Sequence, residues 1–138
     1  MDKRQAFIDA ARALLGTQFT HQGRNATRGV DCVGLAMHAA KEAGLLEQNF
    51  DYTAYGKFPP ADKLTEVMRS RLIVKPIHEA KAGDLLRFHI SGSPIHIGIK
   101  TDVGVIHSLS RRGVIEHVLD DLWASRIVEV YQIPGIEE

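Results

Sequence analysis

The sequence between residues 29 and 35 reads Gly29-Val-Asp-Cys-Val-Gly-Leu35 and holds the only cysteine of the chain, Cys32. From Cys32, apolar side chains recur at helical spacing as far as Ala43, and Gly44 follows as a stop. Asp31 suits the N-cap position, because its carboxylate can accept hydrogen bonds from the free N–H groups of a first helical turn. The pattern therefore predicts a helix that begins at Cys32 and has the thiol at its start.

Helical spacing also occurs on either side of this segment. It runs from Phe7 to Leu15, with Gly16 as a stop, and it returns at Leu64, Val67 and Met68; residues 17–30 have the composition of a loop. The second half consists of short apolar, β-branched segments at residues 72–74, 84–90, 95–100, 104–109, 114–118 and 127–133. Helices followed by strands predict an α+β fold, with N-terminal helices packed on an antiparallel sheet of about five to six strands. No repeat or linker divides residues 1–138, so we expect a single domain.

The composition excludes several classes of protein. The chain has 138 residues, with 17 Lys and Arg against 17 Asp and Glu, so it lacks the basic excess of a nucleic-acid-binding protein. One cysteine cannot form an intramolecular disulfide. Residues 1–10 are charged and lack the apolar run of a secretory signal, and no stretch approaches the ~20 apolar residues of a membrane span. We therefore expect synthesis in the cytoplasm without a signal peptide, no membrane insertion and no nucleic-acid partner.

The position of Cys32 gives it two interpretations. A free cysteine is often only a small buried hydrophobic residue. At a helix start, however, the macrodipole favours the thiolate by about 1–2 kcal/mol, which lowers a pKa by roughly 1–1.5 units. Asp31 opposes this if its carboxylate points at the sulfur. A working nucleophile also needs a histidine close by.

His96 and His107 are the best placed of the seven histidines, because they flank a predicted β-hairpin. A two-residue turn at Thr101-Asp102 sets the two imidazoles directly opposite each other. A four-residue turn at 101–104 sets them diagonally, still on one face, and only a three-residue turn separates them by face. A pair of solvated histidines is the alternative. The histidines expected at the surface or a strand edge, or on another helix face, are His38, His78, His89 and His117.

Cys32, His96 and His107 allow two kinds of chemistry. They could form a Cys-His-His zinc site, although a tetrahedral site takes three or four protein ligands and the sequence has neither HExxH nor paired cysteines. They could also act as nucleophile, base and orienting residue, and this second interpretation explains why the cysteine opens a helix.

Five short blocks follow one another along the chain: Gly16–Gly23, Gly29–Leu35, Ala82–Phe88, His96–Ile99 and Val105–Ser108. In their residues and their order these blocks resemble the NlpC/P60 cysteine peptidases. The family pattern is a glycine-containing loop, Asp-Cys-Ser-Gly-Phe/Leu, Pro-Gly-Asp-Leu, His-Val-Gly-Ile and Ile-His-Ala/Ser. Within the family, His21-Gln-Gly23 and Tyr55-Gly-Lys-Phe-Pro59 resemble the phage-type cell-wall peptidases.

The resemblance implies a papain-like fold in which Cys32 is the nucleophile, His96 the general base and His107 the residue that orients the base. It implies hydrolysis of amide bonds in peptidoglycan stem peptides through an acyl-enzyme, with no metal or cofactor. Asp31 either pairs with a substrate ammonium or only caps the helix, and the residues implied to line the substrate site are Phe19, His21 and Gln22. The implied setting is a phage tail, with tail or baseplate proteins as partners and action in the cell wall.

The chain departs from the family pattern at three places. Val33 replaces the usual Ser, Phe19 stands where Tyr is frequent, and the hairpin between the two histidines is about one residue shorter. Two rival functions follow. One is a non-catalytic structural or plug protein of a phage tail that keeps the fold, and the other is a papain-like amidase or acyltransferase on another substrate.

Overall fold

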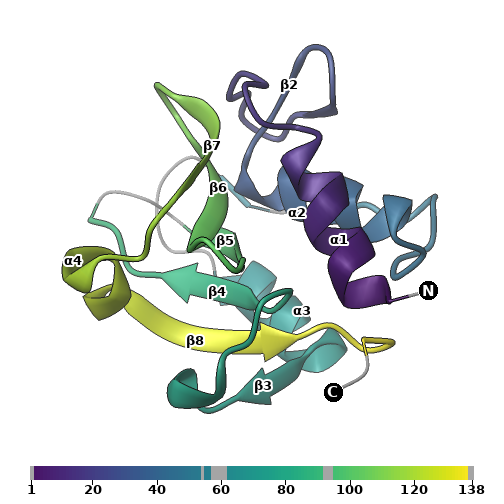
Figure 1. Ribbon diagram of the computed structural model, residues 1–138. Coiled ribbons are helices and arrows are strands. Elements are labelled where there is room, and N and C mark those ends of the chain that lie inside the picture. The colour runs from purple at the N-terminus through teal and green to yellow at the C-terminus, as the bar shows by residue number, and fades with distance from the viewer. Residues whose placement is uncertain (1, 54, 57–61, 92–94, 137–138) are drawn as a thin grey trace.

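The three longer helices come first along the chain and the six longer strands follow, as the hydrophobic pattern predicts (Figure 1). The computed structural model describes residues 2–53, 55–56, 62–91 and 95–136. In chain order the elements are α1 (Lys3–Arg12), β1 (Arg24–Asn25), β2 (Gly29–Val30), α2 (Cys32–Glu42), α3 (Asp62–Arg71), β3 (Ile73–Lys75), a 3-10 turn (Ile77–Glu79), β4 (Leu85–Phe88), β5 (His96–Lys100), β6 (Val105–Leu109), β7 (Gly113–His117), α4 (Asp121–Ser125) and β8 (Ile127–Gln132).

The six longer strands form one sheet in the order β3-β8-β4-β5-β6-β7, in which every neighbouring pair is antiparallel. α1 packs on α2, and α2 packs on β5 and β6. In Figure 1 these two helices stand beside the sheet, while the short α4 lies at its opposite end. The α+β fold with helices on an antiparallel sheet is confirmed.

Alternation along the strands divides the hydrophobic core between the two faces of the sheet. Ile97, Ile99 and Ile106 pack with Leu35 and Ala39 of α2 in the larger cluster. The second cluster covers the other face. It consists of Leu86, Phe88, Val105 and Val130, with Trp123 of α4 against them. His96 and His107 lie on this second face, because both rings contact Phe88.

Some element boundaries differ from the sequence predictions. α1 ends at Arg12 rather than Leu15, and the chain then turns through Gly16, whose φ is +90°. The hydrophobic pattern does not predict α4, because five residues are too few to show a helical period. The loop at 17–30 contains the small β1–β2 hairpin, and Asn25 Oδ1 caps its turn by accepting from Thr27 N and Arg28 N. Within the described ranges, no helix is long and apolar enough to cross a membrane.

Candidate active site

The helix that carries Cys32 begins as the sequence predicts. Asp31 has extended backbone geometry, and its Oδ1 accepts a hydrogen bond of 2.8 Å from Gly34 N, so it is the N-cap of α2. Position 34 has no room for a side chain, so it must be glycine. A Cβ at that position would lie 1.9 Å from the carbonyl oxygen of Gly23, so only glycine lets the loop before β1 lie against the first turn of the helix.

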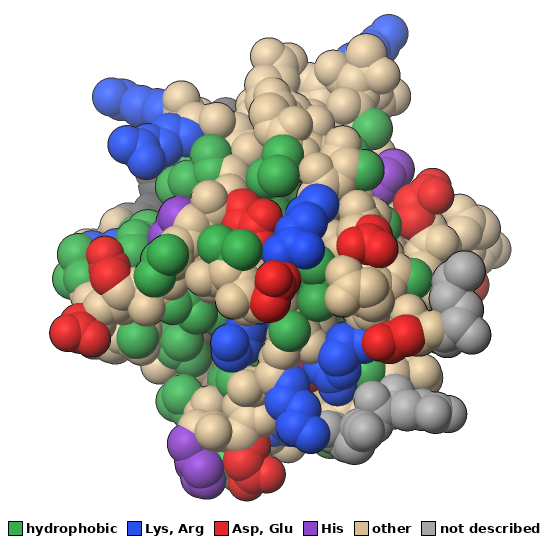
Figure 2. Space-filling view, in the orientation of Figure 1, with side chains coloured by type: hydrophobic (Ala, Val, Ile, Leu, Met, Phe, Trp, Pro, Cys, Tyr) green, Lys and Arg blue, Asp and Glu red, His purple; other side chains and the backbone are tan. Residues whose placement is uncertain are grey.

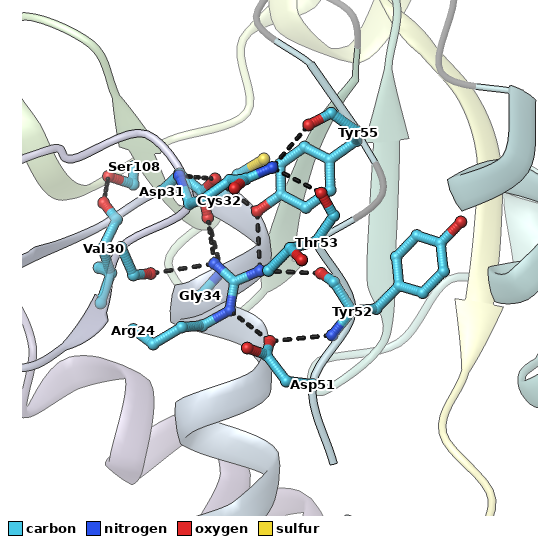
Figure 3. A network of polar contacts seen from close by, with 12 residues as sticks. Arg24, Val30, Asp31, Cys32, Gly34, Asp51, Tyr52, Thr53, Tyr55 and Ser108 are labelled. Atoms are coloured by element: carbon cyan, nitrogen blue, oxygen red, sulfur yellow. Dashed lines mark hydrogen bonds and ion pairs between the residues drawn. The ribbon is translucent and has the colours of Figure 1, made fainter.

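Asp31 is buried and is also the centre of a polar network (Figure 3). Its Oδ2 accepts from Tyr55 Oη at 2.6 Å and from Gln22 N at 2.8 Å, while Arg24 Nη1 lies 3.2 Å from Oδ1. Arg24 in turn binds Asp51 through Nε at 2.8 Å. Four donors from the protein therefore occupy the carboxylate, which supports the capping interpretation of Asp31 over direct pairing with a substrate ammonium.

The three predicted substrate-lining residues lie on the loop beside this network and are half-buried. Gln22 adopts a positive φ of 55°, and its side-chain amide donates to the carbonyl oxygens of Thr53 and Tyr55 at 2.6 and 2.7 Å. The His21 ring meets the Tyr55 ring edge-on with centroids 5.9 Å apart. No ring contact or hydrogen bond of the Phe19 side chain occurs within the described residues. Of the segment Tyr55–Pro59, residues 57–59 lie outside the described part of the chain.

The hairpin brings His96 and His107 together on one face of the sheet. Ile99 pairs with Ile106 and Lys100 with Val105, which is the register of the four-residue turn. Thr101 closes that turn, because its N–H donates to Gly104 O and its Oγ1 accepts from Val103 N and Gly104 N. His96 Nε2 lies 2.7 Å from His107 Nδ1, and both side chains are buried. The prediction of a same-face pair is confirmed, and the solvated pair is wrong.

A third histidine continues this pair, contrary to the expectation that His117 is only a strand-edge residue. His107 Nε2 lies 2.8 Å from His117 Nε2, and His117 Nδ1 lies 2.8 Å from the carbonyl oxygen of Val118. Register could have revealed this contact. His107 pairs with Ile115 in the β6–β7 hairpin, so His117, two residues further on, lies on the same face.

The thiol is not coupled to these histidines. Cys32 Sγ donates to the carbonyl oxygen of Ile95 at 3.9 Å, and no hydrogen bond joins it to His96 in the described structure. Burial, and secondly the negative charge of Asp31, raise the pKa of Cys32 to about 12. The expectation that the helix start lowers this pKa is therefore wrong for the resting protein. The cost of removing a thiolate from water exceeds the roughly 1–2 kcal/mol that the dipole supplies.

The two buried histidines are neutral near pH 7. Burial lowers the pKa of His96 to about 4. Burial, and then the proximity of His96 and His117, lowers the pKa of His107 to about 3. A neutral imidazole can accept a proton, so His96 is in the ionisation state that a general base requires.

Geometry does not favour the zinc interpretation. Among the described residues, no group of three His, Cys, Asp or Glu side chains is arranged to hold a metal ion. The three histidines form a chain of ring-to-ring contacts instead of converging on one point.

The Val33 side chain points to an apolar cavity and not to the histidines. Its side chain is 5% exposed and lines an apolar cavity of about 270 Å³ between α2, α3 and the sheet, together with Met37, Leu64, Met68 and Ile97. A serine at position 33 would put a hydroxyl into this apolar space. The surroundings of Val33 therefore account for its departure from the usual Ser.

The fold and this site define an α+β protein with a cysteine at a helix start and a histidine pair on the adjoining sheet. The chain belongs to the NlpC/P60 family, since the family model matches residues 16–132. A search of curated proteins gives no significant match.

Solved structures show the same fold. The NlpC/p60 domain of the peptidoglycan hydrolase SagA is 21% identical with a TM-score of 0.66, and the match covers 94% of this chain and 97% of that one. A Staphylococcus aureus protein described as similar to a lipoprotein of the NLP/P60 family is 20% identical with a TM-score of 0.65. That match covers 99% of this chain and only 42% of the staphylococcal chain. The P60 domain of an antigen from M. avium subspecies paratuberculosis is 18% identical with a TM-score of 0.55, covering 99% and 96%.

Proposed function

We propose that the protein is a cysteine endopeptidase that hydrolyses amide bonds in the stem peptides of bacterial peptidoglycan. One observation carries this proposal: His96 and His107 share a buried hydrogen bond of 2.7 Å, and His96 directly follows Ile95, whose carbonyl oxygen holds the Cys32 thiol. Membership of the NlpC/P60 family and the structural likeness to a domain of a peptidoglycan hydrolase support it.

In the proposed mechanism the thiol is neutral at rest and loses its proton only when substrate is bound. His96 takes that proton at Nδ1 as the sulfur forms a bond to the scissile carbonyl carbon. The backbone N–H of Cys32, at the start of α2, helps to hold the negative oxygen of the tetrahedral intermediate. The His96 proton then passes to the leaving amine. Water, deprotonated by His96, hydrolyses the thioester and restores the thiol.

The first step requires Cys32 and His96 to come closer than they lie in the resting structure. Proton transfer needs a heavy-atom separation of about 3 Å, and catalytic hydrogen bonds are often long before substrate binds. In this account substrate displaces the thiol from the Ile95 carbonyl oxygen. Phe19, His21 and Gln22 are proposed to line the adjoining substrate site. Asp31 is proposed to hold the loop and the helix start in place.

A phage tail is the proposed setting, with the chain acting as a single catalytic domain carried by tail or baseplate proteins. The His21-Gln-Gly23 block supports the phage-type branch. The net charge of zero also supports delivery by an assembly, because a wall hydrolase that finds an anionic wall unaided gains from a basic surface. Acidic and basic side chains are interspersed on the face in Figure 2. Copurification with tail proteins tests this setting, and tight wall binding by the isolated chain would count against it.

A structural plug is the second candidate, and the neutral thiol without a bond to His96 favours it. Both candidates are tested by incubating the wild type and Cys32→Ala with purified walls of several chemotypes. Muropeptides released by the wild type alone support the peptidase. No release by either variant supports the plug or another amide substrate, and equal release by both removes Cys32 as the nucleophile.

A further inference from the structure

Three imidazole rings form a continuous relay that ends on a backbone carbonyl. The three histidines come from three adjacent strands: His96 from β5, His107 from β6 and His117 from the end of β7. The nitrogen contacts run from His96 Nε2 to His107 Nδ1 at 2.7 Å, from His107 Nε2 to His117 Nε2 at 2.8 Å, and from His117 Nδ1 to Val118 O at 2.8 Å. Each contact is short enough to be a hydrogen bond.

The carbonyl at the end of the relay decides which nitrogen carries each proton. Val118 O can only accept, so His117 Nδ1 must carry a hydrogen. In a neutral ring, His117 Nε2 then has only its lone pair, and His107 must donate to it from Nε2. His107 Nδ1 is left as an acceptor and takes its hydrogen bond from His96 Nε2–H.

Because His96 Nε2 carries the one hydrogen of the neutral ring, His96 Nδ1 carries none. This is also the ring nitrogen that makes no hydrogen bond within the described part of the chain, since the relay uses Nε2. A nitrogen with a free lone pair is what the base of the proposed mechanism needs. In the opposite tautomer, Nδ1 carries the hydrogen and cannot take a proton from the thiol.

We infer that His117, anchored on the carbonyl of Val118, is a positioning residue that fixes His96 in its Nε2–H tautomer and so keeps Nδ1 ready to accept the thiol proton. This inference rests on the proposed peptidase function, and its structural half can be tested without activity. His117 and the carbonyl of Val118 are thereby added to Cys32, His96 and His107 as parts of the proposed active site.

Aromatic side chains pack against the two buried rings of the relay, His96 and His107. Trp123 of α4 meets the His107 ring edge-on with centroids 4.9 Å apart, and it lies 5.3 Å from the His117 ring. Phe88 covers both His96 and His107 at 5.7 and 6.1 Å. The guanidinium of Arg126 stacks on the Trp123 ring, 4.8 Å from its centroid. Around the buried His96 and His107 rings hydrogen-bond direction is strongly enforced, because a misdirected donor there has no water to bind, whereas the His117–Val118 contact lies at the exposed end of the relay.

The test is ¹⁵N NMR of the imidazole nitrogens in the full chain, since the two tautomers give distinct shifts for Nδ1 and Nε2. Resonances are assigned by single replacement of each histidine. The variants are His117→Phe, which keeps an aromatic ring at this position but has neither nitrogen, and His117→Gln, whose amide oxygen can still accept from His107. His78→Phe is the matched control, because the His78 side chain is 83% exposed and outside the relay. Circular dichroism checks that each variant is folded.

The inference predicts Nε2–H for His96 and His107 and Nδ1–H for His117 in the wild type. His117→Phe should shift His96 and His107 towards mixed tautomers and slow wall digestion by at least about tenfold, since a wrong tautomer of a catalytic histidine is costly. His117→Gln should restore both the shifts and most of the rate. Unchanged His96 shifts in His117→Phe would overturn the relay. Changed shifts with an unchanged rate would overturn its role in catalysis. If the wild type digests nothing, the peptidase proposal fails while the shifts still test the relay.

Discussion

At the scale of single residues, the structure differs most clearly from the sequence-based expectation in the reactivity of Cys32. Its side chain is 7% exposed, and burial and Asp31 raise the pKa of the thiol to about 12. Iodoacetamide should therefore label native Cys32 very slowly at pH 7–8, with a rate that keeps rising above pH 9. The same chain in denaturant should label at the rate of an ordinary thiol of pKa about 8.5. Rapid labelling of the native protein below pH 8 would show a preformed thiolate and contradict this account.

Val33 provides a second prediction at this scale. Val33→Thr keeps the shape of the side chain but adds a hydroxyl beside an apolar cavity, so we expect a loss of about 1–3 kcal/mol in the free energy of unfolding. Val128→Thr is the matched control, since Val128 lies on β8 and is 44% exposed, and we expect it to change stability by less than about 0.5 kcal/mol. Urea unfolding measures both. Equal effects of the two substitutions would show that the cavity wall tolerates a polar group.

At the scale of secondary-structure elements, the β5–β6 pairing positions the histidines and depends on Gly98. A Cβ at Gly98 would lie 2.6 Å from Val105 Cγ2 and 3.3 Å from His107 Cβ. Gly98→Ala should therefore push β6 away, displace the His107 ring, and cost about 1–3 kcal/mol of stability as overpacking does. The measurements are urea unfolding and the imidazole resonances of His107. Gly56→Ala is the control, because no atom of the described residues lies within 4 Å of a Cβ there. A stable Gly98→Ala variant with unchanged His107 resonances would refute this role.

The same elements show which features of the structure can be predicted from the sequence. The start of α2 at Cys32 and the shared face of His96 and His107 follow from local rules, since capping and strand register depend on residues close together in the chain. Trp123 could not be placed, because its helix is too short to show a period. Neither could the partners that Asp31 has besides the capping N–H of Gly34, since Tyr55, for example, reaches it across 24 positions of the sequence. The pKa of Cys32 also depends on tertiary burial, which no local pattern reveals.

At the scale of the whole molecule, the buried histidines link stability to pH. The pKa values of His96 and His107 in the folded protein, about 4 and about 3, lie below the ordinary 6.5. The unfolded chain therefore binds more protons between pH 6.5 and about 4, and the free energy of unfolding must fall as the pH falls through this window. The loss is at most about 1.4 kcal/mol per pH unit for each histidine.

Urea unfolding at pH 7.5, 6 and 5 measures this dependence. His107→Gln removes one of the buried groups and should flatten the curve, while the exposed His78→Gln should follow the wild type. A His107→Gln curve as steep as that of the wild type would show that other groups cause the loss.

If the protein is the proposed peptidase, the whole molecule also has to bring the thiol, His96 and the substrate together, because the resting structure keeps Cys32 on the Ile95 carbonyl oxygen. Digestion of peptidoglycan in H₂¹⁸O, followed by mass spectrometry of the released muropeptides, tests this most directly. The account predicts stem-peptide fragments in which the wild type places one ¹⁸O atom at each new carboxyl end, and it predicts no such fragments with Cys32→Ala. Equal fragments from Cys32→Ala, or cleavage confined to the glycan strands, would contradict it.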